Sequence, residues 1–250
     1  MNFLLCNDDG VCSTGITALA ERLKCKHNVL VVAPEKNMSA CSHSLSIRKN
    51  LKLKELINLD NYKVYSLSGT PVDCVKFANL NFSNFNADVV VAGINKGHNL
   101  GSDILYSGTV AIGYEATFFK KIAFCFSVFS LTEENFDEYA IYAEKIIDLL
   151  LPFSEIGVIW NVNFPKTSFS QIKGIKITKL GEQLYTDYYQ KVSENEYVLD
   201  GELVDHDNND QDTDVESVKN GYISVTPILF DKTCYKKIKE VKDLCERLSL

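Results

Sequence analysis

Two adjacent carboxylates follow a short apolar run near the N-terminus. Residues 3–6 are apolar, and Asn7, Asp8, Asp9 and Gly10 come directly after them. Neighbouring side chains on a strand point to opposite faces, so the carboxylates can converge only where the strand has ended, and glycine permits such a break. Carboxylates this close repel each other unless a cation neutralises them, which favours a hard metal ion. An ordinary solvated turn is the alternative interpretation.

Two further loops carry groups that could complete a metal site. Residues 33–44 follow the second apolar run and contain Ser39, whose hydroxyl could supply an oxygen ligand. The same segment is a possible substrate loop through Asn37, Ser42 and His43, although an isolated histidine is more often structural or exposed. In the glycine-rich residues 92–101, backbone amides can approach an anion, and Asn95 offers a neutral oxygen to a metal.

A fourth group suits a phosphate. Ser107, Gly108 and Thr109 open a segment with helical character, and a helix N-terminus combines partial positive charge with free amide donors. A simple helix cap would use the same residues. The glycine-rich loop at 92–101 matches neither G-x-G-x-x-G nor G-x-x-x-x-G-K-[ST], so it lacks the common nucleotide-binding fingerprints.

The elements that must position these groups alternate along the first 165 residues. The pattern predicts strands at 3–6, 28–33, 63–67, 87–92, 122–126 and 157–162, and helices at 14–26, 109–120 and 134–151, with one more beginning at Thr70 and Pro71. This alternation indicates a mostly parallel α/β sheet with helices on both faces. Ligands in such sheets bind beyond the carboxyl ends of the strands, where three of the four groups lie.

The pattern changes after residue 165. Residues 173–178, 185–199 and 221–227 read as β-structure, 205–214 as a polar, acidic loop and 232–248 as a helix. We therefore expect an α/β catalytic core over 1–165, and over 166–250 a β-rich and helical region that also completes the core. Its exposed hairpin-like part could pair with another subunit, because unpaired strand edges favour association.

Composition limits the function classes. The formal net charge is −7, so no basic stripe for duplex nucleic acid is expected. The eight cysteines form no C-x-x-C pair, which argues against a zinc site and favours reduced thiols. No window resembles a membrane span or a signal peptide, so the expectation is a cytoplasmic protein that does not bind membranes.

Taken together, these motifs resemble the SurE family, the stationary-phase survival proteins. The resemblance spans nearly the whole chain and rests on NDDG at 7–10, the 33–39 loop, SGTPVDCV at 68–75, GINKGHNLG at 93–101, YSGTVA at 106–111, NVNFP at 161–165, TDVE at 213–216 and GYISVTP at 221–227. The departures are small: Ala40 and Cys41 replace glycine and another small residue, and Ser46 replaces a common threonine. None of these changes removes a ligand.

The resemblance implies a Rossmann-like α/β fold with a C-terminal β-hairpin and helix oligomerisation region, and homodimers or homotetramers. It implies hydrolysis of nucleoside 5'-monophosphates, together with 3'-monophosphates and short polyphosphate. One Mg²⁺ or Mn²⁺ per subunit would be held by Asp8, Asp9, Ser39 and Asn95, and the phosphate by Ser107, Gly108 and Thr109.

The corresponding mechanistic hypothesis is direct hydrolysis. The metal would lower the pKa of a water and polarise a phosphoryl oxygen, while Asp8 or Asp9 orients that water, and either could accept its proton. Two alternatives remain open. One is a phosphatase with an aspartyl-phosphate intermediate, although the family known for that chemistry carries D-x-D rather than adjacent aspartates. The other is a non-catalytic module that binds nucleotides without metal.

Overall fold

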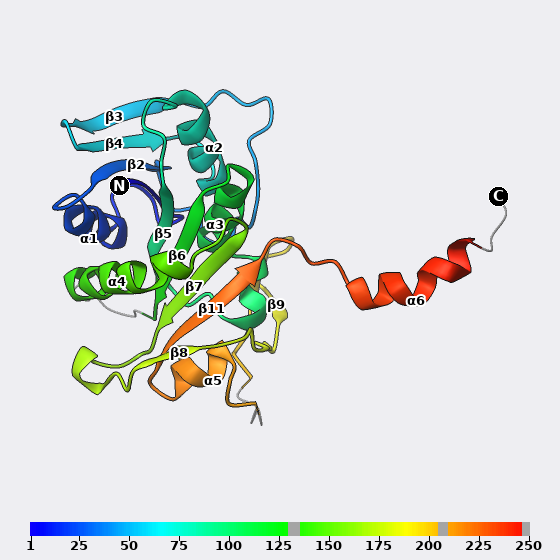
Figure 1. The fold of residues 1–250 in the computed structure, drawn as a ribbon. Coiled ribbons are helices and arrows are strands. Elements are labelled where there is room, and N and C mark those ends of the chain that lie inside the picture. Colours follow the sequence, from blue (N-terminus) through cyan, green and yellow to red (C-terminus); the bar gives the residue numbers. More distant parts are fainter. Residues whose placement is uncertain (130–135, 205–209, 247–250) are drawn as a thin grey trace.

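A single large sheet runs through the molecule (Figure 1). The computed structural model describes residues 1–129, 136–204 and 210–246, and within these residues nine strands join in the order β3-β4-β2-β1-β5-β6-β7-β11-β8. The strands are β1 (Asn2–Cys6), β2 (Asn28–Pro34), β3 (Leu53–Asn58), β4 (Tyr62–Leu67), β5 (Val89–Lys96), β6 (Ile122–Val128), β7 (Val158–Phe164), β8 (Ile175–Ile177) and β11 (Ile223–Leu229).

The sheet is mostly parallel, as the alternating pattern predicts. Strands β4, β2, β1, β5, β6 and β7 pair in parallel, whereas β3 lies antiparallel to β4 and β11 antiparallel to β7. The pattern did not predict β3. All six of its residues are exposed at the sheet edge, so no buried alternation marks it as a strand.

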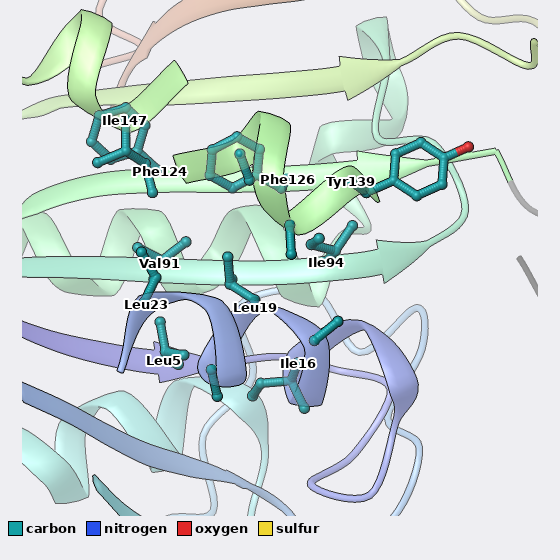
Figure 2. Packing of buried hydrophobic residues seen from close by; sticks show 14 of the residues in the cluster. Leu5, Ile16, Leu19, Leu23, Val91, Ile94, Phe124, Phe126, Tyr139 and Ile147 are labelled. Atoms are coloured by element: carbon teal, nitrogen blue, oxygen red, sulfur yellow. The ribbon is translucent and has the colours of Figure 1, made fainter. Parts of the chain in front are cut away.

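Helices cover both faces of the sheet. The helices α1 (Thr14–Leu23) and α4 (Phe136–Leu150) pack on one face, and α2 (Pro71–Asn81) and α3 (Gly108–Phe118) on the other (Figure 1). Leu5 and Val91 point into the hydrophobic core on the face covered by α1 and α4 (Figure 2). Leu4 and Val90, the preceding residues of the same strands, lie in the hydrophobic core on the face covered by α2 and α3. Alternating side chains therefore explain why these strands are apolar at consecutive positions.

Both helices on the second face begin at capping residues. Thr70 and Asp73 form a reciprocal capping box with Pro71 at the first helical position, which confirms the predicted start of α2. Ser107 caps α3 by accepting a hydrogen bond from the amide of Val110. The helix therefore begins at Gly108, one residue before the predicted start.

The C-terminal region shares the large sheet through β8 and β11. It adds a β-hairpin of β9 (Tyr188–Lys191) and β10 (Tyr197–Asp200), and ends in α6 (Tyr235–Glu246), which extends away from the sheet (Figure 1). Residues 205–209 of the predicted acidic loop lie outside the described residues. Its last residue is not loop: Asp214 begins α5 (Asp214–Lys219), which Thr213 caps.

Short 3-10 helices complete the described elements, at Gly101–Leu105, Leu151–Phe153 and Phe169–Gln171. In the part of the chain that the structure describes, no helix has the length and apolar character needed to cross a membrane.

Candidate active site

Asp8 lies just beyond the end of β1 and is bound by the first residues of α3. The Thr109 hydroxyl donates to Oδ1 at 2.6 Å and the Thr109 amide to Oδ2 at 3.2 Å. The carboxylate is only 4% exposed. Burial raises its pKa, and the hydrogen bonds from Thr109 oppose that rise. The positive end of α3 therefore faces a buried carboxylate.

Asp9 is bound from the last residue of β5. The backbone amide of Lys96 donates to its Oδ2 at 3.1 Å. Burial raises the pKa of Asp9 to about 6, the negative charge of Asp8 adds to the rise, and the Lys96 amide opposes it. Burial is therefore the main reason that both neighbouring acids have raised pKa values.

The turn that brings these carboxylates together is built by its flanking residues. The Asn7 amide donates to the carbonyl of Gly10 at 2.9 Å, and its Oδ1 accepts from the Gly10 amide at 3.2 Å. Gly10 has a φ of 102°, and a Cβ there would lie 3.1 Å from the Lys36 carbonyl carbon. Glycine is therefore required both for the turn and for the close approach of the next loop.

The loop after β2 reaches the same place. The Met38 amide donates to the backbone carbonyl of Asp8 at 2.7 Å, which places Ser39 one residue from that contact. Asn37 shapes the loop, because its Oδ1 accepts from the Ser39 amide at 2.8 Å. The Ser39 residue itself is exposed.

Asn95, near the end of β5, is 8% exposed. Its side-chain amide donates to the Gly97 carbonyl at 2.7 Å, so the donor end of the group is occupied and Oδ1 is the end left for a cation. Further along the loop, the Asn99 amide donates to Asn163 Oδ1 at 2.8 Å, and the Gly101 amide donates to Asp214 at 2.9 Å. These buried contacts fix the path of the glycine-rich loop.

The residues at the start of α3 differ in what their atoms contact. The Ser107 oxygen accepts the capping bond at 3.0 Å, which leaves its hydrogen available to a ligand. A Cβ on Gly108 would lie 2.8 Å from Asp8 Oδ2 and 3.1 Å from Cys41 Sγ, so only glycine fits there. Thr109, one of the predicted phosphate-binding residues, donates from both its hydroxyl and its amide to Asp8.

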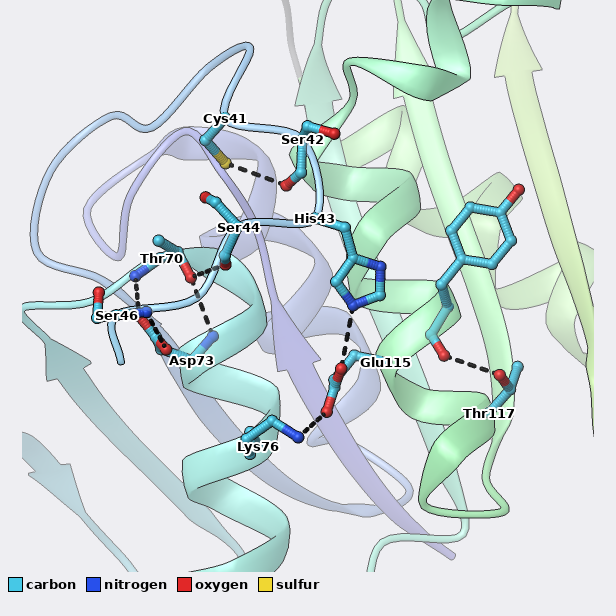
Figure 3. Close-up of polar contacts among 11 residues, drawn as sticks. Cys41, Ser42, His43, Ser44, Ser46, Thr70, Asp73, Lys76, Glu115 and Thr117 are labelled. Carbon is cyan, nitrogen blue, oxygen red and sulfur yellow. Dashed lines mark hydrogen bonds and ion pairs between the residues drawn. The ribbon is translucent and has the colours of Figure 1, made fainter. Parts of the chain in front are cut away.

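Ser42 contacts the residues just before α3, and His43 contacts α3 itself. The Ser42 hydroxyl donates to the Leu105 carbonyl at 2.8 Å, and His43 Nε2 lies 3.0 Å from Glu115 (Figure 3). Lys76 forms an ion pair with the other Glu115 oxygen at 2.6 Å. Sequence reasoning did not single out Glu115 or Lys76. A glutamate within the largely apolar residues 108–118 was the available signal, because buried carboxylates need partners.

Comparisons with known proteins identify the relationship. A family described as Survival protein SurE matches residues 3–187. A 5'-nucleotidase SurE from Clostridium botulinum is 36% identical, covering 98% of this chain and all of that protein. Another, from Caldanaerobacter subterraneus subsp. tengcongensis, is 41% identical and covers 95% of both chains. The chain belongs to the SurE family. The crystal structure of the SurE protein from Aquifex aeolicus has a TM-score of 0.84 with 38% identity, and covers 97% of this chain and 98% of its own.

The SurE loops seen here carry oxygen donors, and Cys41 Sγ also lies near Asp8, beside Gly108. Met38, in the loop after β2, and Lys96, at the end of β5, contact the Asp8–Asp9 pair, and Ser39 and Asn95 are the neighbours of Met38 and Lys96 along the chain. Among the described residues, no group of three or more His, Cys, Asp or Glu side chains could hold a metal ion. Any cation at Asp8 and Asp9 must therefore also use neutral oxygens, and such a donor set fits a hard divalent ion.

Proposed function

We propose that this SurE protein is a divalent-metal-dependent phosphomonoesterase that hydrolyses nucleoside 5'-monophosphates to nucleoside and phosphate. One observation carries the proposal: three separate segments, at Met38, Lys96 and Thr109, each donate a hydrogen bond to the Asp8–Asp9 pair. Relatives matched over 95–98% of the chain are named 5'-nucleotidases. The same activity extends to 3'-monophosphates and short polyphosphate, because all of these present a terminal phosphate.

One Mg²⁺ or Mn²⁺ per subunit is held by Asp8, Asp9, Ser39 and Asn95. The raised pKa values of both aspartates support this assignment, since a cation relieves the repulsion of two buried carboxylates. A bound divalent ion supplies Lewis-acid polarisation of a phosphoryl oxygen and a lower pKa for water.

The protein's own residues bind and orient the reactants. Ser107 and Gly108 hold the phosphate at the α3 N-terminus, where amide donors and the helix dipole stabilise negative charge. Thr109 fixes Asp8 through two bonds, so Asp8 is a rigid anchor. Asp9 is less buried than Asp8. Its Oδ2 accepts a hydrogen bond from the Lys96 amide, which leaves Oδ1 to orient the attacking water.

The decisive test is phosphate release from AMP and GMP with Mn²⁺, and again with excess EDTA. We expect release that depends on the metal. Asp9→Ala should abolish turnover while the melting temperature stays close to that of the wild type. Asp60→Ala, an exposed aspartate in the β3–β4 turn, is the matched control and should keep full activity. Wild-type rates from Asp9→Ala in EDTA would reject the metal mechanism.

The two alternatives have their own signatures. Trapping a phosphoenzyme on Asp8 or Asp9 would support an aspartyl-phosphate route. Nucleotide binding without any phosphate release would support a non-catalytic module. A panel of 5'- and 3'-monophosphates and short polyphosphates, run against several divalent metals, defines the substrate range.

The C-terminal region, residues 166–250, is the candidate oligomerisation region, forming a homodimer or homotetramer. Helix α6 extends from the body with Tyr235, Ile238 and Val241 exposed, and the β9–β10 hairpin exposes Tyr189 and Leu199. Apolar side chains gathered on such projections favour contact with another copy. Light scattering should give a smaller assembly for Ile238→Lys/Val241→Lys than for the wild type, and an unchanged mass would argue against this role for α6.

Cytoplasmic location is the remaining part of the proposal. The seven described cysteines are all free, in keeping with a compartment where thiols stay reduced. Fractionation of cells that produce the protein should recover it with cytoplasmic markers.

A further inference from the structure

A pocket of about 470 Å³ opens beside the first two turns of α3. Its lining includes Ser42, His43, Ser107, Tyr114, Phe230 and Lys232. Ser107 also caps α3 next to Asp8, so the pocket begins where the proposed phosphate position ends. Its size lies within the range of small-molecule sites.

Aromatic rings surround this pocket. The rings of His43 and Tyr114 lie nearly parallel, at 16° and 6.4 Å between centroids. Phe230 packs edge-on against Phe118 at 4.7 Å. Both phenylalanines remain about half exposed, at 52% and 51%. Half-exposed aromatic rings beside a pocket provide faces on which a planar ligand can stack.

His43 is held in one orientation by buried charge (Figure 3). Burial raises the pKa of Glu115, but His43 and Lys76 outweigh this effect and lower the pKa overall, so the carboxylate is ionised near neutral pH. An ionised carboxylate only accepts hydrogen bonds, so Nε2 of His43 must carry the hydrogen. Nδ1 is then the ring nitrogen left to contact a ligand.

A second, larger cavity of about 1080 Å³ lies on the other side of the glycine-rich loop, but its rings are already engaged. The Lys166 amine sits 4.4 Å from the Phe129 ring centroid, and His98 packs against the same ring. The Tyr185 hydroxyl donates to Asp103 at 2.6 Å. The pocket beside α3, in contrast, presents the half-exposed Phe230 ring and includes Ser107 at the start of α3.

We propose that the pocket beside α3 binds the nucleoside part of the substrate, with the base against Phe230 and a polar contact from His43 Nδ1. Glu115 and Lys76 are positioning residues that act through His43. This inference rests on the proposed function and adds the place where the leaving nucleoside is recognised. It also explains why a carboxylate with 2% exposure is kept in an otherwise apolar helix.

The test compares AMP with ribose 5-phosphate, which has the same phosphate ester but no base. For Phe230→Ala, KM for AMP should rise about tenfold, the order of effect expected when one base–aromatic stack is lost, with kcat nearly unchanged. KM for ribose 5-phosphate should stay at the wild-type value. Phe230→Tyr should restore KM for AMP. Phe153→Ala, an aromatic with 71% exposure outside the pocket lining, is the matched control and should change neither substrate.

His43→Gln and Glu115→Gln test the polar contact and its positioning. Each should raise KM for AMP more than KM for ribose 5-phosphate, and melting temperatures identify any loss of folding. Equal changes for both substrates, or no change for AMP in Phe230→Ala, would overturn the nucleoside pocket while leaving the phosphatase intact. Failure of the wild type to release phosphate from AMP would overturn the proposed function and the pocket together.

Discussion

At the scale of single residues, the site depends on bonds that position acids. Asp8 and Asp9 stand out in the sequence because adjacent carboxylates before a glycine are suited to a metal. The partners that orient them do not stand out. The donors are a threonine 101 positions away and two backbone amides, and a backbone amide carries no sequence signal at all.

Thr109→Val tests whether the Thr109 hydroxyl positions Asp8. Valine keeps the shape but removes a buried donor to a charged group, an interaction worth about 1.5–3 kcal/mol. We expect kcat/KM for AMP to fall roughly 10- to 100-fold, by the same free energy. Thr109→Ser keeps the hydroxyl and should retain most activity. If the valine variant matched the serine variant, Asp8 would not need this bond.

Gly108→Ala tests the close contact between α3 and Asp8. The new methyl group would meet Asp8 Oδ2 at 2.8 Å and displace the carboxylate. A displacement near 1 Å can lower rates on the order of 100-fold, so we expect a large loss of kcat in phosphate-release assays. Gly157→Ala is the contrast, because nothing lies within 4 Å of its Cβ. It should lower stability through its φ of 98° but keep kcat.

At the scale of elements, the first residues of a helix also hold a neighbouring loop in place. The α2 capping box also holds the loop at residues 44–46: the Thr70 hydroxyl donates to the Ser44 carbonyl at 2.7 Å, and Asp73 accepts from the Ser46 amide at 3.1 Å (Figure 3). The sequence predicts the cap from Thr70 and Pro71 because capping is local. It does not predict the loop contacts, which join residues more than 25 positions apart.

Thr70→Ala should therefore affect both stability and substrate binding. Loss of the cap should lower the free energy of unfolding by about 0.5–2 kcal/mol in urea denaturation. The freed loop should also raise KM for AMP. Thr70→Ser preserves both bonds and is the control. A stability loss without any change in KM would show that the loop does not depend on this helix start.

At the scale of the whole molecule, the position of β1 determines where the site forms. Strand β1 pairs with β2 on one side and β5 on the other, and ligands in such sheets bind beyond the carboxyl ends of the strands at this kind of branch point. The first face of the sheet is closed by α1 and α4. Glu144 of α4, with 3% exposure, pairs with Arg22 and Lys26 at the end of α1.

The Glu144 contacts predict acid sensitivity. Burial raises the pKa of Glu144, but Lys26 and Arg22 outweigh it and the net pKa is lowered. A carboxyl with a lowered pKa stabilises the fold above its unfolded pKa of about 4.3, and this contribution is lost as pH falls through the folded pKa. Between pH 7 and pH 3, unfolding free energy should fall less steeply for Glu144→Gln than for the wild type. Parallel curves would contradict this assignment.

The sequence by itself determined the local features, because each depends on the side-chain types of a few consecutive residues. These features are the buried strands, the capped start of α2, the acidic pair before Gly10 and the glycine-rich loop. The tertiary structure decided the rest, because it depends on which distant residues meet. Edge strand β3 has no buried face that would mark it in the sequence. Thr109 donates to Asp8, and Glu115 pairs with His43 and Lys76, across distances along the chain that no local pattern encodes. Such pairings arise only when the parallel sheet brings separate loops to one edge.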